Sequence, residues 1–191
     1  DSISGYNGTL GGFGSYVAGR TGQALKGAKG CSGPEGAQVT GFPNLTGYNT
    51  VEGWINPGCG AQSYHVSSWF AKMPFEYTAL GLYLDTIAEP YGGNNFWFRH
   101  SVGDGTTSRS IGTPATYACG SWHHVVAVRE KGAFVRLYVN GSEIVNAIDD
   151  VGNISAATPV SFHDGNGGCG WGLTGETIDD VVVFDMALSS Q

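Results

Sequence analysis

The sequence predicts an all-β fold made of two packed antiparallel sheets. Short segments alternate between apolar and polar residues, the period-two pattern of strands, and helical periodicity is poor throughout. Turn signals separate these segments at intervals of about eight to twelve residues, a spacing typical of a sandwich. The 32 glycines are scattered without a period and accompany five Trp, nine Tyr and nine Phe. This composition also favours short strands joined by tight turns.

The strongest strand prediction covers residues 50–56 (TVEGWIN), where apolar and polar positions alternate. A hairpin is predicted where residues 122–129 (WHHVVAVR) and 134–139 (FVRLYV) flank a short loop that contains glycine. Asn140-Gly141 then forms a second tight turn. The remaining predicted strands cover residues 79–85, 95–102, 142–145, 160–163 and 177–184.

Size and charge narrow the classes of function. A chain of 191 residues fits one sandwich, and we expect a single domain over residues 1–191. Nine Lys and Arg against sixteen Asp and Glu give a net charge of −7 without a basic run. Nucleic acid and anionic membrane surfaces are therefore disfavoured, because both require a cationic patch. No apolar segment approaches the roughly 20 residues of a membrane span.

The compartment is predicted from the cysteines. The four cysteines are far apart and show neither a C-x-x-C pair nor zinc-ligand spacing, so we expect two disulfides and a secreted or cell-surface protein. Three connectivities are open, and we favour Cys59–Cys119 with Cys31–Cys169. The chain opens at Asp1 without a signal peptide, so we expect a mature fragment or an excised domain.

Five segments follow one another in a recognisable order. They are DSISGYNGTL (1–10), VAGRTGQAL (17–25), TVEGWINP (50–57), WHHVVAVREKGAFVRLYVNG (122–141) and GETIDDVVVFDMALS (175–189). In sequence and order they resemble the motifs of laminin-G-like domains in the concanavalin A-like lectin and glucanase superfamily. The resemblance implies a jelly-roll β-sandwich. It leaves the function open, because this fold carries lectins, adhesion domains, glycosidases and polysaccharide lyases.

The resemblance also implies a structural calcium ion between the first loop and the last strand. Ca²⁺ prefers carboxylate, amide and carbonyl oxygens, and the matching side chains are Asp1, Asn7, Asp179 and Asp180. Adjacent residues on a strand face opposite ways. We therefore favour Asp180 as the ligand and expect Asp179 to make turn or core hydrogen bonds. A solvated acidic pair is the alternative.

Aromatic residues provide the candidate ligand contacts, since Trp and Tyr rings stack on sugar rings while nearby polar groups bind the hydroxyls. Trp54 and Trp122 lie inside the fold-defining motifs and are expected to be core residues. Trp97 alternates with Arg99 on one strand and is predicted to face a groove. Ordinary packing is the alternative for each aromatic residue. The predicted ligand-binding residues are Tyr91, Asn94, Asn95, Trp97, Arg99, Trp69 and Trp171.

The acidic residues lack the arrangement that a glycosidase needs. Two carboxylates about 5–9 Å apart would have to face one another. Asp149-Asp150 and Asp179-Asp180 are instead adjacent in sequence and face opposite ways on a strand. Lyase strings and the Gly-x-Ser-x-Gly signature are absent. The remaining candidate for an active site is a groove formed by Arg99, His100 and Tyr117.

The sequence therefore predicts a non-catalytic carbohydrate-binding domain with calcium as its one cofactor and a glycan or polysaccharide as its partner. The first alternative is a protein-binding adhesion or spacer domain. The second is a polysaccharide hydrolase or lyase on the same fold.

Overall fold

A computed structural model describes residues 6–12, 14–27, 36–59, 66–72, 80–88, 95–154, 159–162 and 175–189. In this part of the chain no helix is long and apolar enough to span a membrane. The strands are β1 (Gly8–Leu10), β2 (Ser15–Ala18), β3 (Gln23–Lys26), β4 (Ala37–Val39), β5 (Tyr48–Asn56), β6 (Val66–Lys72), β7 (Leu80–Ala88), β8 (Asn95–Asp104), β9 (Ser108–Gly112), β10 (Tyr117–Ala118), β11 (His123–Glu130), β12 (Phe134–Val139), β13 (Ser142–Ile148), β14 (Val160–Phe162) and β15 (Thr177–Phe184).

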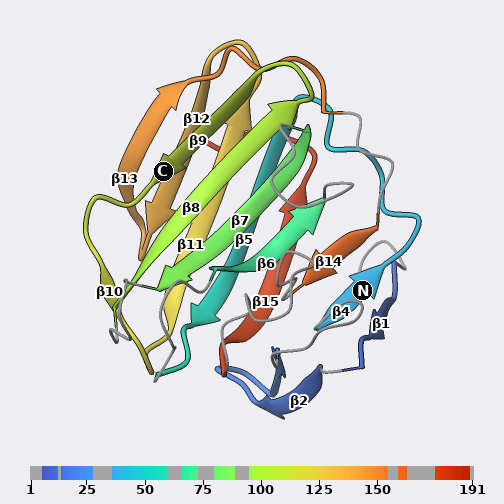
Figure 1. The fold of residues 1–191 in the computed structure, drawn as a ribbon, viewed down its shortest axis with the longest axis vertical. Helices are drawn as coiled ribbons and strands as arrows, with labels where there is room; N and C mark the ends of the chain where they lie inside the picture. Colours follow the sequence, from blue (N-terminus) through green and yellow to red (C-terminus); the bar gives the residue numbers. More distant parts are fainter. Residues whose placement is uncertain are drawn as a thin grey trace.

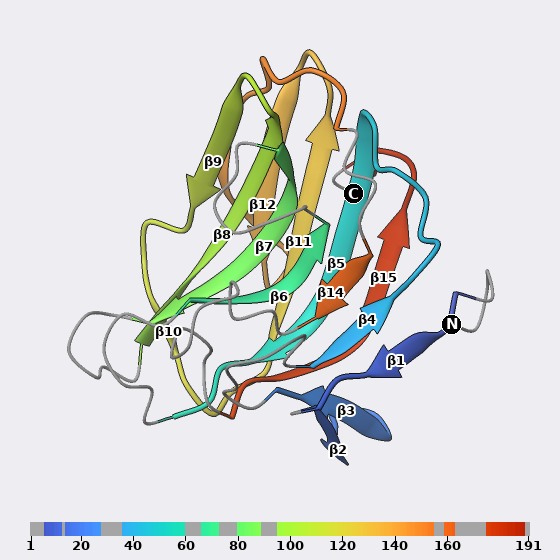
Figure 2. The same cartoon turned by 45° about the vertical axis from the view of Figure 1, so that its right-hand side comes forward.

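The strands form two antiparallel sheets that pack face to face. The eight-stranded sheet has the order β1-β4-β14-β6-β7-β8-β10, and β9 also pairs with β8. The seven-stranded sheet has the order β13-β12-β11-β5-β15-β3-β2. Figure 1 shows the strands of the first sheet crossing over those of the second, and Figure 2 shows β2 and β3 at one end of the sandwich. The predicted jelly-roll β-sandwich is confirmed.

The core lies between the two sheets and follows from strand alternation. In β5, Val51 and Ile55 are fully buried while the residues between them, except Gly53, are partly exposed. In β8, Phe96, Phe98 and Val102 point inward in the same way. Because successive side chains point to opposite faces, the alternating stretches of these two strands contribute every second residue to the core. The other positions form the two outer faces on which a ligand could bind.

Trp69 belongs to this core, so its predicted role in ligand binding is wrong. Its side chain is completely buried in β6, where a sugar ring could not reach it. Gly53 on the facing sheet makes room for it. A Cβ atom at Gly53 would lie 3.4 Å from the Trp69 ring and 3.1 Å from Val181. The glycine within the TVEGWIN strand is thus explained by a large indole packed against its backbone.

The predicted hairpins are confirmed. β11 and β12 pair from Val125↔Val139 to Glu130↔Phe134. The next turn, Asn140-Gly141, has positive φ angles of 52° and 82°. Asparagine and glycine tolerate this left-handed conformation better than other residues, so the pair fits a two-residue hairpin turn.

Candidate functional site

The outer face of β8 carries three of the predicted ligand-binding residues, Asn95, Trp97 and Arg99. Asn95 is exposed, and Trp97 and Arg99 are partly exposed. Their neighbours Phe96, Phe98 and His100 face the core. Residues two apart on a strand share a face and are separated by about 6.6 Å. The strand therefore presents an amide, an indole and a guanidinium in one row, as the alternation predicts.

The strands beside β8 determine how open this row is. Ile87 of β7 lies opposite Trp97 and is partly exposed, which extends the apolar surface next to the indole. Gly112 of β9 lies opposite Arg99 and is exposed. Because glycine has no side chain, this flank of Arg99 is left uncovered by β9. Farther along β8, Ser101 forms a 2.8 Å hydrogen bond with Ser110. The ligand-accessible part of the row thus lies at the Asn95 end of β8.

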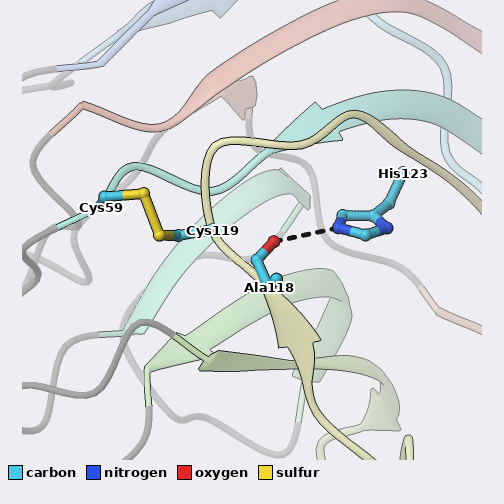
Figure 3. The surroundings of a disulfide bond; sticks show 4 residues. All are labelled: Cys59, Ala118, Cys119 and His123. Atoms are coloured by element: carbon cyan, nitrogen blue, oxygen red, sulfur yellow. Dashed lines mark hydrogen bonds between the residues drawn. A yellow bond between two sulfur atoms is a disulfide. The ribbon is translucent and has the colours of Figure 1, made fainter.

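A disulfide fixes the structure at this end of β8. Cys59, just after β5, is bonded to Cys119, just after β10, with a Cα–Cα distance of 5.0 Å (Figure 3). β10 pairs with the start of β8 through Tyr117↔Phe96 and Ala118↔Asn95. The disulfide therefore links the seven-stranded sheet to the strand bordering Asn95. The favoured pairing of Cys59 with Cys119 is confirmed, whereas Cys31 and Cys169 lie outside the described residues.

Other predicted contacts fall in segments that the structure leaves undescribed. Tyr91, Asn94 and Trp171 are among them, and so is the predicted metal ligand Asp1. They remain predictions.

The two aspartates of β15 have different environments. Asp179 is buried, and its carboxylate accepts hydrogen bonds from the backbone amides of Arg20 at 2.8 Å, Thr21 at 3.1 Å and Asp180 at 3.0 Å. Asp180 is exposed, and its carboxylate accepts a 2.8 Å hydrogen bond from the Thr21 hydroxyl. Asp179 thus makes turn hydrogen bonds, as predicted for it.

The hydrogen bonds around Asp179 do not suit a calcium ligand, and Asp180 as a ligand stays a prediction. Three amide N–H groups already point at the Asp179 oxygens, so a cation there would face their positive ends. Asn7 is exposed and precedes β1 in the other sheet. Within the described residues no group of three His, Cys, Asp or Glu side chains could hold a metal ion.

His100 does not form a catalytic group with Arg99. His100 is fully buried, and burial, reinforced by the positive charge of Arg129, lowers its pKa to about 4. Arg99 next to it points to the opposite face of the sheet. Tyr117 packs against the rings of Phe98 and His123, and its ring centroid lies 5.3 and 5.2 Å from theirs, respectively. The groove of Arg99, His100 and Tyr117 considered for an enzyme is therefore not formed.

A second group of polar and aromatic side chains lies on the outer face of the seven-stranded sheet. Trp54 is partly exposed there, so the expectation that it is a core residue is wrong. Its ring centroid lies 5.0 Å from that of His124, and the Arg20 guanidinium carbon lies 3.7 Å from it. Alternation already indicated this orientation, because Val51 and Ile55 in the same strand face inward. Arg20 carried no comparable sequence signal, since it reaches Trp54 from a distant turn.

The comparison with protein families identifies the family of this chain. The family model described as the concanavalin A-like lectin/glucanases superfamily matches residues 32–191, and the chain belongs to this family. This confirms the resemblance seen in the sequence motifs. No curated protein matches the sequence.

Among solved structures, the fold is similar to that of toxin binding domains. The binding domain of Paraclostridial mosquitocidal protein 1 has a TM-score of 0.75 at 15% identity, over 99% of this chain and 46% of that chain. The botulinum neurotoxin serotype G binding domain has a TM-score of 0.71 at 13% identity, over 98% and 45%. The botulinum neurotoxin DC binding domain, in complex with SialylT, has a TM-score of 0.70 at 15% identity, over 98% and 45%. At these identities the similarity concerns the fold alone, and the chain spans less than half of each structure.

Proposed function

We propose that this chain is a non-catalytic carbohydrate-binding domain whose site lies on the outer face of β8. The observation that carries the proposal is the partly exposed indole of Trp97, in one row with Arg99 and Asn95. A sugar ring would stack its apolar face on the indole while the guanidinium and the amide bind its hydroxyls. Ile87 would extend the apolar contact.

The family and the similar structures support this proposal. Three of the similar structures are binding domains of toxins, and one of them was solved in complex with SialylT. A non-catalytic role also accords with the separation of Arg99 from His100 by the sheet.

We also propose that the domain is extracellular and that it holds a structural calcium ion. The Cys59–Cys119 bond suits an oxidising, extracellular location. A calcium ion held partly by Asp180 would be structural, since Asp180 lies in β15 of the seven-stranded sheet and the Trp97 row lies in the other. The ion would stabilise the turn beside β15 and would make no contact with the sugar.

A glycan array with calcium and with EDTA tests the proposal. We expect binding in both conditions, and we expect Trp97→Ala to weaken it at least about tenfold, because burying one aromatic side chain contributes about 1.5–3 kcal/mol. Tyr48→Ala is the matched control, since Tyr48 is 54% exposed and lies on the other sheet. Undiminished binding by the Trp97 variant would rule out this site. No binding at all would favour the protein-binding alternative.

A further inference from the structure

The side chains around Trp54 form a second surface with binding chemistry, on the sheet opposite Trp97. We call Arg20, Glu52, Trp54 and His124 the Trp54 cluster. β5 and β11 pair so that Trp54 lies directly opposite His124. The His124 Nε2 atom is 3.6 Å from a Glu52 carboxylate oxygen, and both side chains are between a quarter and a third exposed. The imidazole and the carboxylate are therefore partly exposed beside the indole, and the Arg20 guanidinium covers one face of that indole.

The turn that carries Arg20 is fixed onto the sheet. The Asp179 carboxylate accepts from the backbone amides of Arg20 and Thr21, although these residues are 159 and 158 positions apart from it in sequence. The Thr21 hydroxyl donates to Asp180. A Cβ atom at Gly19 would lie 2.5 Å from an Asp179 carboxylate oxygen, so glycine is required for the turn to approach this closely. The backbone of Arg20 is thus held in place before any ligand arrives.

The Arg20 guanidinium has N–H groups that can donate hydrogen bonds to a ligand. Its carbon lies 3.7 Å from the centroid of the Trp54 ring. Within the described part of the chain, the guanidinium stacks on Trp54 and has no carboxylate within ion-pair distance. A stacked guanidinium keeps its in-plane N–H groups at its edge, where they can reach a ligand. Their planar arrangement matches a pair of neighbouring hydroxyls.

The charges around the cluster select the kind of ligand. Glu52, Asp179 and Asp180 provide three carboxylates against the single guanidinium of Arg20, in a chain whose net charge is −7. An acidic saccharide would be repelled. Uncharged sugar hydroxyls both donate and accept, so they can bind the Arg20 edge and the partly exposed Glu52 carboxylate at once.

We infer that the Trp54 cluster is a second saccharide subsite, selective for neutral sugars, and that the domain is therefore bivalent. The inference rests on the proposed carbohydrate-binding function and adds a second site to it. Trp54 and Trp97 lie on the outer faces of opposite sheets. One short saccharide could not contact both, so the two sites would bind two separate chains and could link them.

Fluorine NMR of the whole chain labelled with 5-fluorotryptophan tests each face separately. The Trp54 and Trp97 resonances are assigned with Trp54→Phe and Trp97→Phe. The probes are neutral oligosaccharides (cellohexaose, laminarihexaose, mannohexaose, maltohexaose and lactose) at millimolar concentration, with hexagalacturonate as the acidic comparison. We expect at least one neutral probe to shift the Trp54 resonance and the acidic probe to leave it unchanged.

Each pattern of shifts decides between the two proposals. If Trp97 responds and Trp54 does not, the second subsite is overturned and the proposed function stands. If Trp54 responds and Trp97 does not, the β8 site is overturned and the second subsite stands. If neither responds to any probe, both are overturned.

Variants of Arg20 separate binding from a structural role. Arg20→Ala should weaken the affinity measured at Trp54 at least about tenfold, because the charge-assisted hydrogen bonds from the guanidinium to the sugar hydroxyls are lost. Arg20→Lys keeps the charge but loses the planar fork and should recover only part of the affinity. Arg109→Ala, which removes a partly exposed guanidinium paired with Asp150, is the charge-matched control. If Arg20→Ala lowers stability and leaves the affinity unchanged, the inference is wrong.

Discussion

Arg129 and Asp149 form an ion pair of 2.7 Å in which both side chains are completely buried. The guanidinium also donates to the backbone carbonyls of Thr46, Val151 and Gly152. It thereby ties the segment after β13 to the strand β11 and to the loop before β5. A buried charge stays stable only while its partners remain, so this pair should be sensitive to the loss of either side chain.

We predict that Asp149→Ala lowers the free energy of unfolding by about 3–5 kcal/mol, because it leaves the Arg129 guanidinium buried without its counter-charge. Urea unfolding followed by tryptophan fluorescence measures the change. Asp150→Ala is the matched control, since Asp150 pairs with Arg109 on the surface and should cost at most about 1 kcal/mol. Equal losses in the two variants would contradict the prediction.

The buried His100 should make the fold sensitive to mild acid. Its pKa falls from 6.5 to about 4, chiefly through burial, so between these values the unfolded chain binds more protons than the folded one. Stability is therefore full above pH 6.5 and declines as the pH falls towards 4, by about 3 kcal/mol at most for this group.

His100→Phe should remove that part of the pH dependence, and the comparison with the unmodified chain cancels the titration of the other groups. Unfolding free energies measured at several pH values between 7 and 4 give the two slopes. Parallel slopes would mean that His100 does not titrate differently on folding.

Strand alternation predicted much of this fold because an antiparallel sandwich buries one face of each strand. It predicted the strands of the β11–β12 hairpin and the row of Trp97 and Arg99, while the Asn140-Gly141 pair itself predicted the turn after β12. The same rule, applied to TVEGWIN, places Trp54 outside. Assigning Trp54 to the core from its membership of a family motif overlooked the alternation around it.

Contacts distant in sequence could not be predicted in this way. The burial of Trp69 depends on Gly53 in the facing sheet, and no local pattern connects the two. The stacking of Arg20 on Trp54 depends on a turn held by Asp179. Both arrangements follow from how the sheets meet, which a one-dimensional pattern does not contain.

The Cys59–Cys119 bond should contribute strongly to stability, because it closes a loop with a sequence separation of 60 residues. In the chain-entropy model, such a loop corresponds to about 4 kcal/mol. We predict that the double variant Cys59→Ala, Cys119→Ala unfolds at a correspondingly lower urea concentration. Adding a reductant should shift the unmodified chain towards the double variant. If reductant destabilises the double variant equally, the effect arises elsewhere in the chain.

The Asp179 tether should depend on the glycine beside it. Gly19→Ala would place a Cβ atom 2.5 Å from a carboxylate oxygen of Asp179, so the turn would have to move off β15 and lose the hydrogen bonds to Arg20 and Thr21. Losing bonds to a charged acceptor costs about 1.5–3 kcal/mol each, and we predict a loss of at least the lower value. Gly12→Ala is the control, because a Cβ atom there would meet nothing within 4 Å. Since the turn carries Arg20, the Trp54 fluorine resonance should shift in Gly19→Ala and not in Gly12→Ala. An unshifted resonance in the Gly19 variant would show that Arg20 stacks on Trp54 without the tether.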